Sequence, residues 1–448
     1  MIPSDNKITR VGVIALSRIL DDPRVRRQCE ILCASGYEVF AIGQDDVRQE
    51  VVPWTVVGKS RSGLVISHRN ESKYKNLSFV ARWRRRFNKP PRELARILLS
   101  LPLAVALRIK PIAGVLYGVI LVVRAQRCRL QPRYALEVFW SWRGDLSDLY
   151  EKAKHLKCDV WLANDWTALP IAARLAKENG GVYIYDTHEF ALQEYQERWV
   201  WRISQKPLVA ALERSFIYGA RFVTAVSSGI SDRLTAIYKL PKPVVTIRNT
   251  PRHVATPFRA TPPLVRVLYH GIVAPGRGLE AAIDSVSAWA PDRELYIRGP
   301  GGAEYVESLK RRIADAGLQP RVFIIPPVPM TELVSAAAEF DIGFFALPGH
   351  SLHNQFALPN KFFEYTMAGL ALSVSRLPEM ELLIKEFELG STFAEVEPGC
   401  IAAAINAMSR ADIDRFKRNA LKAAETLCWE KESEKLLSAI GELAVAGK

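Results

Sequence analysis

Several patterns that identify a protein class at once are missing from this chain of 448 residues. Its six cysteines form no C-x-x-C pair and no cysteine–histidine cluster with zinc-binding spacing. Neither a disulfide framework nor a zinc domain is therefore indicated, and we expect a reducing, cytoplasmic compartment. The glycine-rich loop G-x-G-x-x-G does not follow the first expected strand, which argues against a dehydrogenase.

Long apolar runs are missing as well. No stretch reaches the roughly 18 to 20 uninterrupted apolar residues of a membrane-spanning helix, and the polar segment 1–10 contains no signal-peptide core. Hydrophobic residues still make up 49% of the chain and charged residues 24%, a globular balance that excludes a disordered or collagen-like protein. At about 150 residues per domain, the length fits two or three domains.

The excess of positive charge is confined to one segment. The net charge is +14, but residues 61–133 alone hold 17 basic and two acidic side chains, so the rest of the chain is close to neutral. Basic residues surround Trp83 and Phe87, and two apolar runs follow, 97–107 and 112–123, each about half a membrane span. We expect a basic, apolar helical insertion that associates with an anionic membrane surface. A helical hairpin packed on its own domain is one alternative; a nucleic-acid surface, without a recognition motif, is the weaker one.

Buried strands alternate with helical patterns in both halves of the chain. Residues 11–16 (VGVIAL) form a run typical of a strand buried on both faces, and similar runs recur. The expected strands are 11–16, 38–42, 159–163, 182–185, 222–226, 244–247, 265–269, 294–297, 322–325, 342–346 and 371–375. The proline-rich stretch 251–263 is typical of a linker between an N-terminal domain, 1–250, and a C-terminal domain, 264–448. The sequence predicts an α/β fold of two Rossmann-like domains that face each other across a cleft, with ligands at the carboxyl ends of the strands.

A first motif, 269–280 (YHGIVAPGRGLE), predicts a site for a diphosphate. An expected strand ends at a glycine, Gly271, and a helix follows Arg277 and Gly278. Amide groups at a helix start and a guanidinium together suit a diphosphate. An ordinary strand–helix turn is the alternative.

A second motif, 358–370 (LPNKFFEYTMAGL), places Lys361 and Glu364 on one face of an expected helix, with Asn360 as its N-cap. A lysine near a helix start can hold phosphate, and a carboxylate one turn later can accept two ribose hydroxyls. A surface ion pair would explain the same spacing.

Polar residues also follow strands of the first half. His188 lies in YDTHEF, directly after an expected strand, and Asp165 follows the preceding strand, so both belong to one edge of the sheet. A structural histidine bonded to Asp186 or Glu189 is equally compatible with this spacing.

Taken in order, these segments resemble the family 4 glycosyltransferases, which are retaining enzymes with the GT-B fold. The resemblance covers most of the chain outside residues 45–150. Its motifs are DDPRVRRQCEILCASGYEV from Asp21, ANDWTALP from Ala163, YDTHEF, HGIVAPGRGLE, LPNKFFEYTMAGLALSV and CWEKESEKLL from Cys428. The segments PNKFFEYTMAG and APGRGLE are the specific ones.

The resemblance implies that a nucleotide sugar binds the C-terminal domain, with Glu364 at the ribose. It implies three catalytic residues: His188, Arg277 and Lys361. The other implied donor-binding residues are Gly271, Gly278, Arg298, Gly299 and Asn360, and those on the acceptor side are Asp22, Arg24, Asp165 and Glu189. No metal or other cofactor is expected, because basic side chains and helix ends would neutralise the leaving diphosphate.

Two positions depart from the family pattern. Phe356 stands where many members have the first of two glutamates, and Ile272 stands where many have an arginine; Arg298 is the expected substitute for the missing charge.

The resulting prediction is a peripheral enzyme at the inner face of the cell membrane. It would move a sugar to a lipid-linked or polysaccharide acceptor in envelope or exopolysaccharide synthesis. The alternative is an inactive, glycosyltransferase-like scaffold of an envelope-assembly complex. No nucleic-acid partner is expected, and the oligomeric state stays open.

Overall fold

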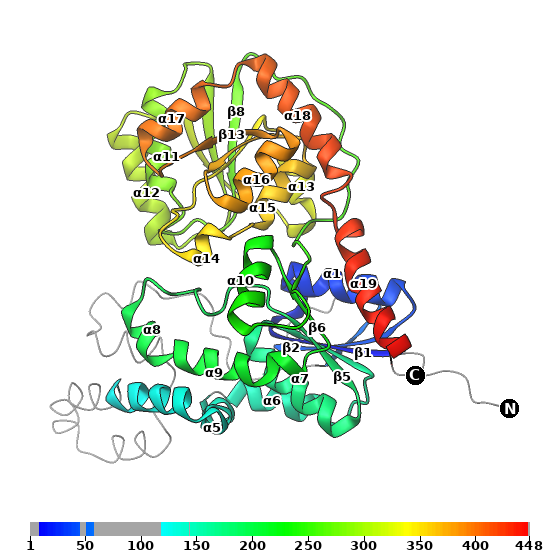
Figure 1. The fold of residues 1–448 in the computed structure, drawn as a ribbon. Helices are drawn as coiled ribbons and strands as arrows, with labels where there is room; N and C mark the ends of the chain where they lie inside the picture. Colours follow the sequence, from blue (N-terminus) through cyan, green and yellow to red (C-terminus); the bar gives the residue numbers. More distant parts are fainter. Residues whose placement is uncertain (1–8, 45–50, 58–117, 143, 447–448) are drawn as a thin grey trace. The chain divides into compact units, whose positions relative to one another are not determined.

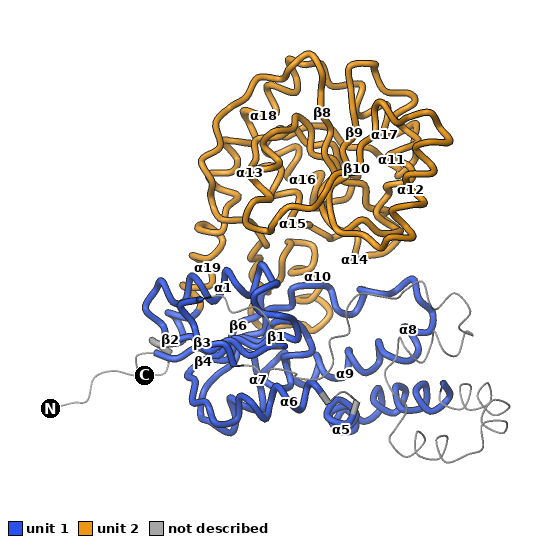
Figure 2. The backbone as a smooth tube through the Cα atoms, turned by 180° about the vertical axis from the view of Figure 1, so that it is seen from behind, with its two compact units in different colours: residues 1–224, 440–448 blue, residues 225–439 orange. Residues whose placement is uncertain are grey.

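The computed structural model describes residues 9–44, 51–57, 118–142 and 144–446. The chain divides into two compact units, which are residues 1–224 with 440–448 and residues 225–439 (Figure 2). The stretch 251–263, expected as a linker, therefore lies within the second unit. Most of the expected basic insertion lies outside the described residues; of its final part, residues 118–130 are helical.

The first sheet has seven strands in the order β3-β2-β1-β4-β5-β6-β7. They are β1 (Arg10–Arg18), β2 (Glu38–Gln44), β3 (Thr55–Val57), β4 (Val160–Asn164), β5 (Val182–Asp186), β6 (Phe222–Ala225) and β7 (Val245–Thr246). The central strand β1 pairs in parallel with β2 on one side and β4 on the other. In such a doubly wound sheet the chain changes direction between these two strands, and a crevice opens at their carboxyl ends.

Helices of this part of the chain follow the strands (Figure 1). They are α1 (Pro23–Ala34), α5 (Pro132–Trp142), α6 (Gly144–Ala153), α7 (Asp165–Asn179), α8 (Trp199–Ser204), α9 (Lys206–Phe216) and α10 (Ser228–Tyr238). Helix α1 begins cleanly because Asp22 caps it, accepting from the amides of Arg24 and Val25, and because Pro23 suits the first helical position.

The second sheet has six parallel strands in the order β10-β9-β8-β11-β12-β13. They are β8 (Val265–His270), β9 (Arg293–Arg298), β10 (Val322–Ile325), β11 (Ile342–Phe345), β12 (Ala371–Ser375) and β13 (Gly390–Phe393). The order matches that of a Rossmann sheet, whose switch point here lies between β8 and β11. Large apolar side chains of both faces are fully buried, as this arrangement requires.

Two groups of helices pack on this sheet (Figure 1). One group consists of α11 (Leu279–Ser285), α12 (Ala303–Asp315) and α17 (Pro398–Asn406). The other consists of α13 (Leu333–Ala337), α15 (Asn360–Met367), α16 (Pro378–Phe387) and α18 (Arg410–Ala424). The short helix α14 (Leu352–Gln355) precedes α15, and α19 (Trp429–Ala446) ends the described chain.

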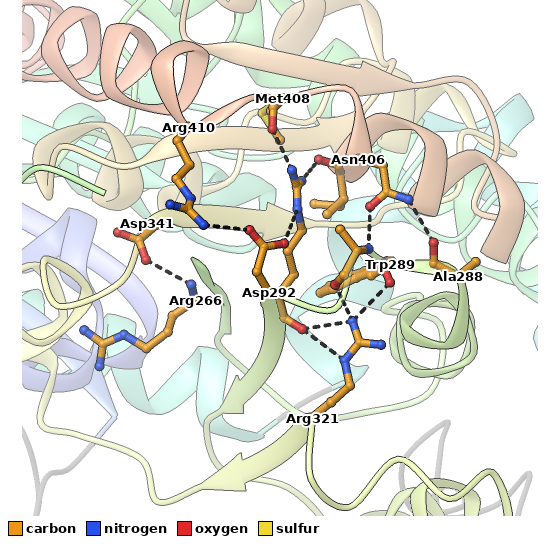
Figure 3. A network of polar contacts seen from close by, with 12 residues as sticks. Arg266, Ala288, Trp289, Asp292, Arg321, Asp341, Asn406, Met408 and Arg410 are labelled. Atoms are coloured by element: carbon orange, nitrogen blue, oxygen red, sulfur yellow. Dashed lines mark hydrogen bonds and ion pairs between the residues drawn. The ribbon is translucent and has the colours of Figure 1, made fainter. Parts of the chain in front are cut away.

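A network of polar contacts closes one edge of the second sheet (Figure 3). Buried Asp341, just before β11, accepts from the amide of Arg266 on β8 at 2.9 Å and from Lys417 on α18 at 3.1 Å. Arg410 contacts Asp292, just before β9, at 3.4 Å. These residues stand at the amino ends of parallel strands, opposite to the edge where ligands bind in such sheets. We therefore assign the network to stability.

The predicted α/β fold with two Rossmann-like sheets is confirmed. Strands β10 and β12 have the predicted bounds, whereas β3 and β13 were not predicted. Within the described residues, none of the helices combines the length and hydropathy needed to cross a bilayer.

Candidate functional site

The site in the second unit begins where β8 and β9 end. The amide of Gly271 donates to the carbonyl of Arg298 at 3.0 Å, so the two loops after these strands are joined. A Cβ on Gly299, whose φ is 150°, would lie 1.8 Å from the carbonyl oxygen of Gly271. A Cβ on Gly271 would lie 2.7 Å from Nζ of Lys361. Gly299 is required because the backbone of the neighbouring loop approaches so closely, and Gly271 because its φ of 127° strains any residue with a side chain.

Lys361 enters the site from the first turn of α15. Its Nζ is 3.5 Å from the hydroxyl of Tyr269 and 4.5 Å from the ring centroids of both Tyr269 and Phe345. Burial, followed by the positive charge of Arg277, lowers the pKa of Lys361 to about 7, against the smaller opposing effect of Glu364. The ammonium thus lacks a full counter-charge, which is the condition of a group prepared for an anionic ligand.

The positive charge of Arg277 lowers the pKa of Lys361. The two residues come from positions far apart in the sequence, yet their charges lie close enough for the guanidinium to disfavour the protonated lysine. Arg277 is half-buried and stands directly before Gly278, which adopts φ 67° as the N-cap of α11. The pairing of these two cations on one ligand stays a prediction.

Glu364 lies one helical turn after Lys361 and meets a residue that the motif analysis overlooked. Its Oε2 is 2.9 Å from Nε2 of His270. His270 is the last residue of β8, is buried, and stacks on Tyr365 with ring centroids 4.6 Å apart. The Tyr365 hydroxyl accepts from the His270 amide at 2.9 Å, which holds the histidine backbone in place. A buried histidine at the carboxyl end of a switch-point strand was a signal that could have identified it.

One expectation for this unit changes. Asn360 is the first residue of α15 and not its N-cap, a position taken by Pro359. Arg298 is buried, donates to the carbonyl of Ala336 at 3.1 Å and lies over the ring of Phe340. That Arg298 substitutes for the missing charge stays a prediction.

Phe356 follows α14 and packs against the start of α10. The carbonyl of Phe356 accepts from the hydroxyl of Ser227 at 2.8 Å, and Arg233 lies 5.7 Å from the centre of its ring. A Cβ on Gly229 would lie 2.2 Å from the Phe356 ring and 2.7 Å from a carboxylate oxygen of Glu379. The aromatic ring thus lies beside polar groups at the start of α10.

A second polar cluster lies at the carboxyl edge of the first sheet. Asp165 begins α7 after β4, His188 follows β5, and both have positive φ angles, 68° and 54°. Their Oδ1 and Nδ1 atoms are 3.8 Å apart. Burial alone would lower the pKa of His188, but the interaction with Asp165 and the charge of Glu189 outweigh it and raise this pKa to about 9. A pKa raised in this way favours the protonated imidazole, which can donate from both ring nitrogens.

Two of the four residues expected on the acceptor side, Arg24 and Asp22, take part in contacts within the first unit. Arg24 is buried and binds Asp186 through two nitrogens, at 2.5 and 2.8 Å, and Gln28 and Thr224 complete the shell of that carboxylate. Asp22 caps α1 and accepts from Ser17 at 2.8 Å. In this structure Arg24 and Asp22 support the loops and do not present free polar groups to an acceptor.

The two clusters permit different chemistry. The one at Arg277 and Lys361 can hold a diphosphate, with Glu364 as an acceptor for hydroxyl groups. The one at His188 can donate hydrogen bonds to an oxygen-rich ligand. Among the described residues, no group of three or more histidine, cysteine, aspartate or glutamate side chains is arranged to hold a metal ion.

Comparisons with known proteins bear on the fold. No protein-family model matches the sequence, and no curated protein does. A solved sucrose-phosphate synthase from Thermosynechococcus elongatus has a TM-score of 0.65 and 13% identity over 98% of this chain and 100% of its own. HepE from Anabaena, in complex with UDP and glucose, has a TM-score of 0.61 and 13% identity over 97% of this chain and 100% of its own. The lipopolysaccharide outer core galactosyltransferase WaaB has a TM-score of 0.57 and 10% identity over 97% of this chain and 99% of its own. These similarities establish the predicted GT-B fold for this chain.

Proposed function

We propose that the chain is a glycosyltransferase whose donor is a nucleoside diphosphate sugar. The observation that carries the proposal is the electrostatic coupling of Arg277 and Lys361 at the switch point of the second sheet. Two cations that repel each other in the free protein gain a shared counter-ion when a diphosphate binds. Glu364, one turn from Lys361, is placed to accept ribose hydroxyls.

The proposed reaction breaks the bond between the anomeric carbon of the sugar and the diphosphate oxygen. Arg277 and Lys361 stabilise the negative charge that develops on the leaving diphosphate, which is why we propose a metal-independent enzyme. His188, as a cation, donates to the sugar near its reacting carbon. With no residue assigned as a base or nucleophile on the opposite face, we propose a same-face transfer through an oxocarbenium-like state, so that the configuration is retained. The acceptor hydroxyl forms the new bond and gives its proton to the leaving group.

Proteins of similar fold support the choice of donor. HepE was solved with UDP and with UDP-glucose, and a trehalose-6-phosphate protein from E. coli was solved with UDP-2-fluoro glucose. We extend these donor classes to the present chain on the strength of its own residues at the switch point. The family 4 assignment is part of this proposal.

A lipid-linked or glycan acceptor at the membrane surface, in envelope or exopolysaccharide synthesis, completes the proposal. The basic and apolar composition of residues 61–133 supports it, because each basic side chain near an anionic leaflet contributes about 1 kcal/mol. The protein would then act in the cytoplasm, at the inner face of the membrane.

A second function is favoured by one observation. Phe356 packs against the start of α10 and stands where the resemblance implies a glutamate that helps to hold the donor sugar. An inactive scaffold with a glycosyltransferase fold would tolerate this change.

Incubation of the purified protein with a panel of nucleotide sugars, with and without membrane extract, separates the two functions. Release of the nucleoside diphosphate from one donor, increased by the extract, supports the transferase. Absence of both turnover and nucleotide binding supports the scaffold.

A further inference from the structure

Exposed apolar side chains gather on two helical segments of the first unit. Val119, Val123 and Leu130 of the helical residues 118–130 are 52%, 60% and 82% exposed. Trp199 and Ile203 of α8 are 61% and 37% exposed. The spacings of four and seven residues put the first three on one helical face, and the spacing of four does the same for the pair on α8.

The two segments are direct neighbours, so these side chains form one surface. Gln126, on the same helical face as Val123, donates to the carbonyl of Ile203 at 3.2 Å. A small, partly open cavity of about 40 Å³ lies where the two segments meet α5 and α9. Its lining residues are Leu121, Arg124, Ala125, Cys128, Val138, Ser204, Gln205 and Leu208. Figure 1 shows the corresponding chain, in cyan, beside α8 and α9.

The charged side chains around this surface are predominantly basic. Residues 118–133 and 197–206 contain seven basic side chains and one acidic side chain, Glu197. The basic residues are Arg124, Arg127, Arg129, Arg133, Arg198, Arg202 and Lys206. A partner that fits must be anionic at its surface and apolar beneath it. A nucleic acid offers the first property without the second, whereas an anionic bilayer offers both.

We propose that this face, consisting of Val119, Val123, Leu130, Trp199 and Ile203 with the surrounding arginines, docks on an anionic lipid bilayer. Trp199 is its anchor, since an indole ring is favoured at the level of the lipid headgroups. The proposal extends the membrane association of the proposed function to α8, about which the composition of the 61–133 segment says nothing. Its biological role rests on that function, but binding to lipid does not depend on catalysis.

Sedimentation of the full chain with phosphatidylcholine vesicles, with and without phosphatidylglycerol, tests this surface. The wild type should bind the anionic vesicles and lose binding at high salt. Because a large apolar side chain contributes about 1.5 to 3 kcal/mol on burial, Trp199→Ala should lower the vesicle partition coefficient about tenfold or more. Leu382→Ala, which changes a residue of α16 that is 53% exposed, is the matched control and should bind as the wild type does.

Arg198→Glu combined with Arg202→Glu should abolish the preference for anionic lipid. Equal vesicle binding by the wild type and Trp199→Ala overturns the proposal. So does a Trp199→Ala protein with a lowered melting temperature and unchanged vesicle binding, because the ring would then be covered by the chain itself. Nucleoside diphosphate binding, measured by calorimetry on the same proteins, should not change. If no nucleotide binds while Trp199-dependent vesicle binding persists, the transferase fails and the docking surface stands.

Discussion

Nε2 of His270 lies 2.9 Å from Oε2 of Glu364, with the histidine buried under the carboxylate. Glu364 belongs to the motif that is expected to bind ribose, and His270, the last residue of β8, contacts its carboxylate. We infer from this contact that His270 is a positioning residue that acts through Glu364.

Replacement of His270 tests this relationship. His270→Leu should weaken a nucleoside diphosphate several-fold and leave its 2′,3′-dideoxy counterpart nearly unaffected, because only the first carries the hydroxyls that Glu364 would accept. His270→Gln keeps a hydrogen-bond donor and should restore part of the affinity for the nucleoside diphosphate. Calorimetry with both ligands measures the two affinities. Equal losses for the two ligands would mean that His270 serves only packing against Tyr365.

The pKa of about 7 at Lys361 predicts proton uptake on binding. Above pH 7 the free lysine is largely neutral, and a diphosphate favours its charged form, so binding draws a proton from the buffer and affinity falls as the pH rises. Calorimetry at pH 8 in two buffers of different ionisation enthalpy counts this proton. Lys361→Arg remains charged and should take up none, while still binding the ligand. Uptake that persists in Lys361→Arg would assign the proton to another group.

Asp165 should be the main reason that His188 is charged at neutral pH. Asp165→Asn removes the largest of the effects that raise the pKa of His188 and leaves burial opposed by Glu189, so this pKa should fall from about 9. Histidine NMR titration measures this, with the signal of His155 as an internal reference. A pKa of His188 that stays near 9 in Asp165→Asn would contradict the assignment.

The same shift has a consequence for stability. Because the folded-state pKa of His188 is raised, the contribution of its protonation to the free energy of unfolding is complete below about pH 6.5 and is lost as the pH rises through about 9.

His188→Ala should lower turnover more than donor affinity. Full turnover in that variant would make the histidine purely structural.

The buried pair of Arg24 and Asp186 should be important for folding. Arg24→Ala leaves an uncompensated buried carboxylate and should lower the free energy of unfolding by about 3 to 5 kcal/mol. Arg26→Ala, on the same helix but in a partly exposed pair with Glu30, is the control and should cost under about 1 kcal/mol. Urea denaturation compares the two. Similar losses would argue that Arg24 is not a principal support of the His188 loop.

Much of the fold could be predicted from the sequence because buried parallel strands have a strong signature. Runs such as 11–16 and 371–375 are apolar or small throughout and bounded by turns. Strands β3 and β13 lack that signature, since β3 has three residues, β13 reads GSTF, and both are edge strands. Pattern-based reasoning could not distinguish them from loops.

The candidate site was only partly predictable. Lys361 and Glu364 stand in a specific motif, and the coupling to Arg277 agrees with their expected role. His270 was overlooked because its partner Glu364 lies 94 positions away in the sequence, on helix α15, and only the fold brings the two together. The contact of Arg298 with Ala336 of α13 could not be predicted for the same reason.

The central claim is that Arg277 and Lys361 grip one diphosphate, and the affinity of their alanine variants for a nucleoside diphosphate tests it most directly. Each charge-assisted bond is worth about 1.5 to 3 kcal/mol, so Arg277→Ala and Lys361→Ala should each bind about ten- to a hundredfold more weakly than the wild type. Lys310→Ala, on the exposed face of α12, should bind as the wild type does. Wild-type affinity in both Arg277→Ala and Lys361→Ala would contradict the account.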